Sequence, residues 1–204
     1  VSADADDGTA YQNFRALQSA GVAGAESIGG VFYFTTAFDT KTTGADLVVT
    51  YPVEWGNGST TNLTGSLNYN KTEFDGNVDD LFNEESQFDF ENGTPELRAV
   101  LTAVHDIGDF SVLGRANYYG SYENSNGGST ISVTQEFDPE IMFDLEGSYT
   151  FNDRYKLSIG ARNVFDNYPD AGEIGETCCG RIYRSDSIVD WQGGYYYSKF
   201  TADF

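Results

Sequence analysis

Carboxylates are the side chains with the most capacity for chemistry in this sequence, and several occur in adjacent pairs. Asp79 and Asp80 lie in the same acidic stretch as Glu84 and Glu85. Two carboxylates with separated pKa values can act as a general acid and base, and a group of four could bind a hard cation through oxygen ligands. We treat these four residues as candidate metal ligands, with Ca²⁺ as the candidate ion and otherwise no cofactor. In a chain with 32 acidic residues, the alternative is a solvated acidic loop.

The two cysteines, Cys178 and Cys179, are adjacent. Neighbouring Cα atoms lie about 3.8 Å apart, which is below the usual disulfide range of about 4.4–6.8 Å. A strained vicinal disulfide in an oxidising compartment is one interpretation, and two free thiols or pairing with another part of the protein are the others. His105 is the only histidine, and no Cys-x-x-Cys spacing is present, so no zinc site is predicted.

Other catalytic patterns are not found in the sequence. It contains no Ser-His-Asp set, no P-loop and no glycine-rich dinucleotide fingerprint. We therefore do not expect an enzyme. A nucleic-acid partner is not expected either, because the 11 basic residues do not cluster and the formal net charge is −21.

Composition indicates a β protein of 204 residues, with 15% aromatic residues and 23 glycines. The absence of an 18-residue apolar run excludes a transmembrane helix, but a transmembrane barrel stays open because its strands give a weaker signal. The sequence begins at Val1 and shows no signal peptide, so we expect a mature or excised piece of a protein.

Alternation of apolar and polar residues with period two predicts about seven strands. In the second, Leu63, Leu67 and Tyr69 alternate with Asn, Thr and Ser. Before the strands, Phe14 and Leu17 have helical spacing and predict a short helix. The predicted strands lie within 45–53, 61–70, 96–106, 110–120, 140–151, 155–162 and 193–204.

The connections between these strands alternate strictly between short and long. The short ones, rich in Gly, Asn and Asp, are 54–59, 106–109 and 152–154, and the long acidic ones are 75–94, 121–138 and 166–192. In an antiparallel meander, all short turns then lie at one end and all long loops at the other. That sorting is typical of outer-membrane barrels. A β-sandwich with one wet face also alternates along its strands, but it gives no reason for this sorting.

Several segments together resemble the C-terminal part of TonB-dependent outer-membrane receptors. The most specific is "GARNVFDNYP" (160–169), which matches the recurrent Asn-(Leu/Val)-Phe-Asp signature of that family, and the next is the closing strand that ends in Phe204. The resembling segments are 32–53, 67–74, 90–122, 143–170 and 193–204.

The resemblance implies an all-β fold in which an antiparallel meander of about seven strands forms the C-terminal part of a large, 22-stranded barrel. Residues 1–30 would be an acidic extracellular loop with a short helix, and 31–204 the barrel segment. Seven strands are too few to close a barrel, so an N-terminal plug and further strands are expected elsewhere in the protein. The implied function is import of a scarce nutrient such as a siderophore, cobalamin, haem or glycan across the outer membrane of a Gram-negative bacterium.

The same resemblance implies a set of partners. They are outer-membrane lipid and lipopolysaccharide, the missing plug and strands, TonB by way of the plug, the barrel assembly machinery and a small-molecule ligand. In the long loops we select Phe82, Phe88, Phe90 and Trp191 as candidate ligand contacts; alternatively, these aromatics pack their own loops. Phe200 and Phe204 are the candidate assembly signal. Two other functions remain open, a stand-alone structural or adhesive barrel and a secreted carbohydrate-binding β-sandwich.

Overall fold

The computed structural model describes residues 9–28, 38–126, 131, 133–172, 182–184 and 187–203. The chain divides into two compact units, Val1–Ala37 and Phe38–Phe204. The first unit contains α1 (Thr9–Ser19) and the short 3₁₀ helix η1 (Ala25–Ser27). The short helix predicted in this part of the sequence is therefore present. No helix in the described ranges is long and apolar enough to cross a membrane.

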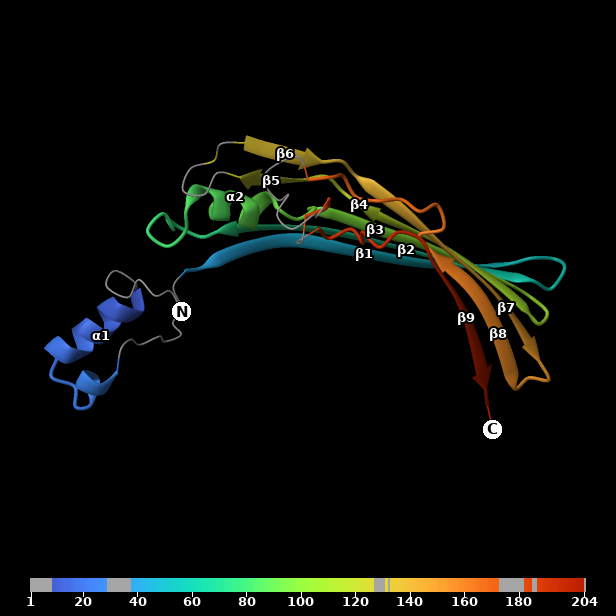
Figure 1. The fold of residues 1–204 in the computed structure, drawn as a ribbon. Coiled ribbons are helices and arrows are strands. Elements are labelled where there is room, and N and C mark those ends of the chain that lie inside the picture. Colours follow the sequence, from blue (N-terminus) through green and yellow to red (C-terminus); the bar gives the residue numbers. More distant parts are fainter. Residues whose placement is uncertain are drawn as a thin grey trace. The chain divides into compact units, whose positions relative to one another are not determined.

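The second unit is built on one antiparallel sheet of seven strands (Figure 1). Every strand pairs with the next sheet strand along the chain, in the order β1-β2-β3-β4-β7-β8-β9. The predicted meander of seven strands is confirmed. The strands are β1 (Thr40–Glu54), β2 (Thr60–Phe74), β3 (Leu97–Ile107), β4 (Phe110–Tyr119), β7 (Glu140–Phe151), β8 (Tyr155–Arg162) and β9 (Tyr195–Ala202).

Tight turns connect the strands at one end of the sheet, as the Gly/Asn/Asp-rich segments predict. Gly58 and Gly108 have φ of 80° and 56°, and Asn152 and Asp153 have φ of 56° and 54°. These left-handed conformations suit glycine, asparagine and aspartate better than other residues. Figure 1 shows the three short turns together at the right-hand end of the sheet.

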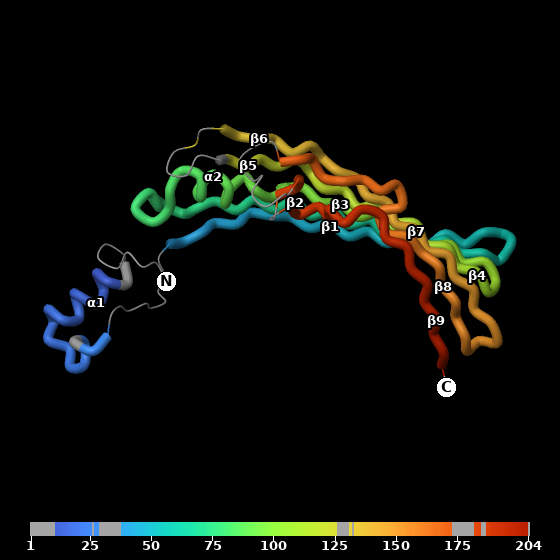
Figure 2. Tube along the Cα trace, in the orientation of Figure 1, coloured from blue at the N-terminus to red at the C-terminus, as the bar shows by residue number. Residues whose placement is uncertain are grey.

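The long connections contain secondary structure that the sequence analysis does not predict. The first carries α2 (Glu84–Asn92), and the second forms the hairpin of β5 (Tyr122–Asn126) and β6 (Val133–Phe137). The side chain of Asn83 caps α2 by accepting from Ser86 N at 2.8 Å. Figures 1 and 2 show α2 and the hairpin at the end of the sheet opposite to the short turns.

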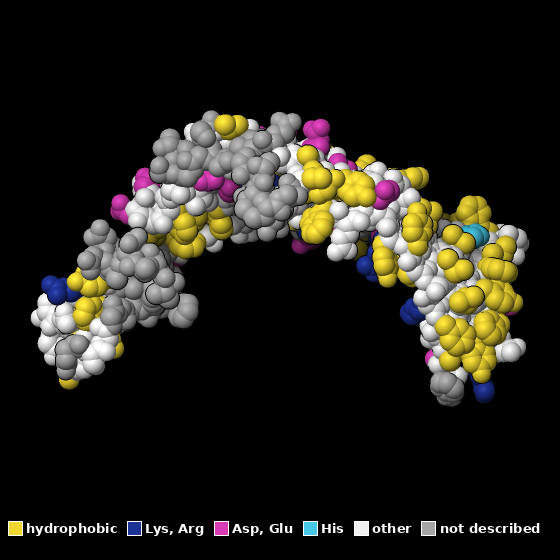
Figure 3. Space-filling model, viewed as in Figure 1, with side chains coloured by type: hydrophobic (Ala, Val, Ile, Leu, Met, Phe, Trp, Pro, Cys, Tyr) yellow, Lys and Arg dark blue, Asp and Glu magenta, His cyan; other side chains and the backbone are white. Residues whose placement is uncertain are grey.

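One face of the sheet is apolar and largely uncovered. Leu101, Phe110 and Ile159 point to this outward face and are 57%, 58% and 65% exposed. Hydrophobic side chains gather over the part of the sheet near the short turns, and most visible acidic side chains lie nearer the other end (Figure 3). A sandwich would cover such a face with a second sheet, and none covers it among the described residues of this unit. An exposed apolar surface of this extent indicates contact with an apolar environment.

Aromatic rings form a belt on the outward face near the short turns. Phe110 packs on Tyr149 with ring centroids 4.6 Å apart, and Tyr155 stacks on Phe151 at 5.4 Å and on Phe200 at 6.0 Å. Such belts are typical of the interfaces of membrane barrels.

The two margins of the sheet are open. Within the described residues, β1 pairs only with β2, and β9 pairs only with β8. Unpaired strand edges are prohibitive in hydrocarbon, because each free N–H and C=O lacks a partner there.

Candidate functional site

The polar face of the sheet is crossed by side-chain hydrogen bonds between neighbouring strands. Asn68 Nδ2 donates to Asp46 Oδ1 at 2.6 Å, which joins β2 to β1. Arg115 Nε donates to Thr102 Oγ1 at 3.2 Å, which joins β4 to β3. Asn117 Nδ2 donates to Asp144 Oδ2 at 3.1 Å, which joins β4 to β7. These bonds place polar groups on this face from β1 to β7, as the wall of a water-filled lumen requires.

A longer bridge on the same face joins two strands that are not neighbours. Tyr197 Oη on β9 donates to Glu146 Oε2 on β7 at 2.7 Å. Gly160 of β8 lies between them in register, opposite Glu146 on one side and Tyr197 on the other. A Cβ at Gly160 would overlap the ring of Tyr197. Glycine at this position therefore lets the tyrosine lie flat across β8.

The three long connections meet at Asp89 of α2. Asp89 Oδ1 accepts from Ser125 N at 2.6 Å and from Ser125 Oγ at 2.9 Å, and Ser125 belongs to β5. Asp89 Oδ2 lies 3.9 Å from Arg184 Nη2, which comes from the connection between β8 and β9. One carboxylate thus joins segments from 75–94, 121–138 and 166–192.

Further contacts join the hairpin to the third connection. Gln135 Nε2 donates to Ala171 O at 2.8 Å, and Asp138 N donates to Asp170 Oδ2 at 2.7 Å. We call α2, the hairpin and the described parts of 163–194 the cap. Because side chains tie its three segments together, the cap behaves as one folded layer and not as three separate loops.

The hairpin has its own small apolar core. Tyr122 and Phe137 lie opposite each other in register and stack with ring centroids 4.6 Å apart. They are 6% and 3% exposed. This stacked pair explains why a polar connection folds as a hairpin.

The signature segment forms a clamp where β8 ends. Asn163, with φ of 48°, donates from Nδ2 to Asn167 O at 2.7 Å and accepts from Asn167 N at Oδ1 at 3.0 Å. Asp166, with φ of 58°, accepts from Gly194 N at 2.7 Å, directly before β9. Asp166 also accepts a hydrogen bond from the Tyr168 phenol, which raises the pKa of that tyrosine. The Asn and Asp of this segment thus fix the turn that leads from β8 toward β9.

Two of the four predicted ligand-contact aromatics pack on aromatic rings beside β1 and at the end of β2. Phe82 lies with its ring centroid 5.0 Å from Phe38 and 5.2 Å from Phe74, and Phe90 stacks on Phe74 at 4.4 Å. Phe82 and Phe90 therefore have a packing role. Phe90 still lines a hollow, which is described below. Phe88 lies on α2, and Trp191 is 53% exposed beside β9. A role for any of the four in ligand binding stays a prediction.

A hollow of about 180 Å³ lies where the cap meets the polar face. Asn68, Asn70 and Arg98 line it from the sheet, and Phe90 and Glu91 line it from α2. The guanidinium of Arg98 lies over the Tyr119 ring, 4.9 Å from its centroid. Amide, guanidinium and carboxylate groups beside an aromatic ring suit a ligand that both donates and accepts hydrogen bonds.

The predicted metal ligands lie along α2 and the segment before it, and not around one point. No group of three or more His, Cys, Asp or Glu in the described part of the chain could hold a metal ion. Asp79 accepts from Asn77 Nδ2 at 2.8 Å and from Gln87 Nε2 at 3.2 Å, and these bonds lower its pKa. Glu84 and Glu85 occupy the first turn of α2, where negative charge is favourable. Metal binding stays a prediction.

Three of the remaining predicted residues, Cys178, Cys179 and Phe204, lie outside the described residues. Phe200 is 60% exposed on the outward face, and its role as an assembly signal is untested. Sequence reasoning missed the Asp89 contact, the Glu146–Tyr197 bridge and the Arg98 hollow, because each joins residues that are distant in the sequence.

Comparison with models of protein families gives a match. A family model described as "TonB dependent receptor-like, beta-barrel" matches residues 7–164. The match covers the sheet from β1 to β8 and ends within the Asn163 turn. Comparison with curated proteins and with solved structures gives no match.

Proposed function

The chain belongs to the TonB-dependent receptor β-barrel family, and we propose that it forms the C-terminal wall of a barrel that imports a scarce nutrient across the bacterial outer membrane. The observation that carries the proposal is the contrast between the two faces of the sheet. Asp46, Thr102 and Asp144 are hydrogen-bonded on one face, and Leu101 and Ile159 are exposed on the other. A lumen requires the first face and lipid the second.

The open margins of the sheet support a complete barrel of about 22 strands. The outer edges of β1 and β9 would pair with further strands of the receptor, which would remove both free edges. The lumen would hold a plug domain, and the polar face described here would contact it. Energy would reach the plug through TonB.

The cap supports a role in capture at the outer mouth. Asp89 ties its three segments together, so the residues that approach the ligand are held in place before binding. The Arg98 hollow and the exposed Trp191 are the candidate contacts. A siderophore, cobalamin, haem or glycan offers the polar groups and flat surfaces that such contacts recognise.

The experiment that tests this function is nutrient uptake by the intact receptor. A strain that lacks the receptor gene is grown with iron supplied as siderophores or haem, with cobalamin, and with glycans as sole carbon source. We expect loss of growth on one of these sources, restoration by the wild-type gene, and no restoration when TonB is also removed. Normal growth of the deletion strain on every source, or uptake that does not need TonB, would contradict the proposal.

A further inference from the structure

Three residues near the short turns are joined by consecutive hydrogen bonds. Trp55 Nε1 donates to Thr61 Oγ1 at 2.8 Å, and Thr61 Oγ1 lies 2.8 Å from His105 Nδ1. Trp55 belongs to the turn that follows β1, Thr61 to β2 and His105 to β3. We call these three residues the histidine network.

The network determines which ring nitrogen of neutral His105 carries the proton. An indole N–H can only donate, so Thr61 Oγ1 accepts from Trp55. The hydroxyl proton of Thr61 then needs an acceptor, and the other bonded partner of Thr61 Oγ1 in the described part of the chain is His105 Nδ1. Neutral His105 therefore accepts at Nδ1 and carries its proton on Nε2. The imidazolium form has a proton on Nε2 as well, so this nitrogen is a donor in both forms.

This donor lies on the outward face and has no acceptor within the described protein. Leu101, Ala103 and His105 alternate with inward residues along β3, so all three side chains lie on the outward face. Nε2 of His105 has no hydrogen-bond partner among the described residues. A polar group in apolar surroundings is unfavourable unless it is hydrogen-bonded. The acceptor is therefore expected in the medium that covers this face.

The neighbours of His105 in its cross-strand row are uncharged. His105 pairs with Thr61 on one side and with Val112 on the other. The row continues to Val53 on β1 and to Gly147 on β7. An anionic acceptor on His105 would therefore meet no repelling carboxylate among these residues of the row.

The aromatic belt indicates the depth of His105 in a membrane. The next outward row toward the short turns contains Ile107, Phe110 and Tyr149, and the last two belong to the belt. Such aromatic residues lie at the level of the lipid headgroups. His105 adjoins that level.

The length of the apolar part of β2 gives a similar depth. Thr61 and Lys71 are the first polar residues on either side of the outward set that runs from Leu63 to Tyr69. At about 3.3 Å per residue, Thr61 and Lys71 are about 33 Å apart along the strand. A tilt of about 40° reduces this to about 25 Å across the bilayer, which is the height of the apolar band of an outer-membrane barrel. The histidine network therefore lies at the boundary of this band.

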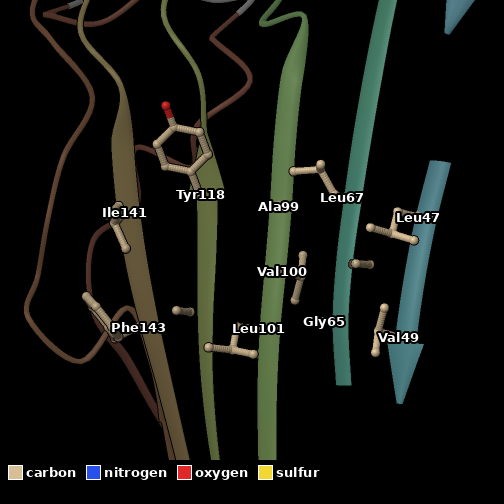
Figure 4. A pocket seen from close by; sticks show the side chains of 12 residues that line it. Leu47, Val49, Gly65, Leu67, Ala99, Val100, Leu101, Tyr118, Ile141 and Phe143 are labelled. Atoms are coloured by element: carbon tan, nitrogen blue, oxygen red, sulfur yellow. The ribbon is translucent and has the colours of Figure 1, made fainter. Parts of the chain in front are cut away.

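The middle of the band offers no acceptor to His105. Figure 4 shows Leu67, Leu101 and Phe143 on the outward face of β2, β3 and β7, where they line a groove of about 400 Å³. Neither these side chains nor lipid tails contain an acceptor oxygen. The oxygen that pairs with Nε2 must come from the boundary of the band.

The phosphate is the strongest acceptor that a lipid headgroup supplies at this boundary, because hydrogen bonds to a charged oxygen are stronger than those to a neutral one. We propose that His105 Nε2 binds the phosphate of a glycerophospholipid in the leaflet on the short-turn side, and that Trp55 and Thr61 hold the ring in place for this contact. Lipopolysaccharide is expected on the opposite side, at the cap. The inference rests on the proposed function, because it requires the outward face to lie in the bilayer. It adds a lipid contact that fixes the depth of the barrel.

Solid-state NMR of the complete receptor with ¹⁵N-labelled histidine tests the contact. The receptor is reconstituted in vesicles of phosphatidylethanolamine and phosphatidylglycerol, His105→Gln identifies the signal of His105, and the dephasing of that signal by ³¹P is measured. An N–H···O distance of about 2.9 Å places phosphorus roughly 4 Å from Nε2. We expect a protonated Nε2 that is dephased more strongly than Nδ1. A deprotonated Nε2, or no dephasing by phosphorus, would overturn the inference.

A second reconstitution separates lipid phosphate from free phosphate. The receptor is placed in vesicles of diglucosyl diacylglycerol, which contains no phosphorus, in a buffer of inorganic phosphate. We expect no dephasing of the His105 signal under these conditions. Dephasing equal to that in phospholipid vesicles would show a site for free phosphate and would overturn the lipid assignment.

A matched pair of variants tests the network. Thr61→Val removes the hydroxyl that donates to His105 Nδ1 and keeps the shape of the side chain. Thr64→Val is the control, because Thr64 lies on the same strand but on the polar face, where it bonds to Thr50. We expect Thr61→Val to lose at least half of the ³¹P dephasing and to show the Nδ1-protonated tautomer, and Thr64→Val to change neither. Equal results for the two variants would contradict the role of the network.

The inference and the proposed function fail in different ways. A receptor with a lipid-exposed label at Leu101 but no phosphorus near His105 would refute this inference alone. A label at Leu101 that is exposed to water would refute the proposed function first.

Discussion

Tyr197 and Glu146 are hydrogen-bonded across an intervening strand, with 2.7 Å between Tyr197 Oη and Glu146 Oε2. The contact joins β9 to β7 over Gly160 of β8. The strand β9 is thereby held by β7 as well as by β8, its direct neighbour in the sheet. The bridge therefore stabilises the margin of the sheet where β9, among the described residues, is paired on one side only.

Gly160→Ala is expected to destabilise this margin. A methyl group at position 160 would overlap the Tyr197 ring, so the ring must move and the bond to Glu146 is lost. Overpacking of this kind costs about 1–3 kcal/mol. Urea unfolding of the complete receptor in lipid vesicles measures the change. Gly147→Ala on β7 is the control, because its Cβ would meet open space. Equal urea midpoints for the two variants would contradict the role of the bridge.

Asp89→Ala is expected to loosen all three segments of the cap. The change removes the acceptor of Ser125 N and Oγ and the partner of Arg184. Ser125 is 1% exposed, and a buried polar group that loses its partner costs about 1–3 kcal/mol. Hydrogen exchange should then rise in α2, in β5 and around Arg184 together. Asp80→Ala, which alters an exposed carboxylate before α2, should leave exchange in β5 unchanged. A rise confined to α2 in Asp89→Ala would show that the segments are not coupled.

The segment before α2 is expected to respond to acid through Asp79. Hydrogen bonds from Gln87 and Asn77 lower the pKa of Asp79. Their stabilising effect is fully present above the unfolded Asp pKa of about 3.9, and it is lost as pH falls through the lower folded value. A nitroxide label at Leu81, which is exposed, should gain mobility as the pH is lowered from 6 toward 2. The variant Asp79→Asn should lack this transition. Identical acid responses in the two proteins would contradict the assignment.

Phe200→Asp is expected to reduce the amount of receptor in the outer membrane. Phe200 is exposed on the outward face within the aromatic belt, and a charge there costs on the order of 1 kcal/mol in a membrane interface. Thr201→Asp changes the next residue, which points to the polar face, and should have little effect. Outer-membrane fractionation with an immunoblot measures both. Equal surface levels would contradict the outward placement of Phe200.

The sheet was predictable because its signals are local. Period-two alternation and the Gly/Asn/Asp turns determine which residues share a face and where each strand reverses. The ends of β1 and β2 were not predictable, since Lys41, Thr43, Lys71 and Glu73 continue the pairing without apolar alternation.

The cap could be predicted only in part. Asn83 followed by Glu84 and Glu85 is a helix-start signal in the sequence, so α2 could have been found. The hairpin could not, because its polar residues hide the Tyr122–Phe137 pair that holds it. The Asp89 contact depends on residues 36 positions apart and on Arg184 beyond them, and no local pattern links them.

A wall with lipid on one side and a water-filled lumen on the other has one direct test. Single nitroxide labels are placed at Leu101 and Thr102 of the intact receptor in lipid vesicles, and their collisions with oxygen and with a water-soluble nickel complex are measured. Leu101 points outward and Thr102 lies on the polar face. We predict that the label at 101 collides mainly with oxygen and the label at 102 mainly with nickel. Nickel accessibility at position 101 equal to that at position 102 would contradict the account.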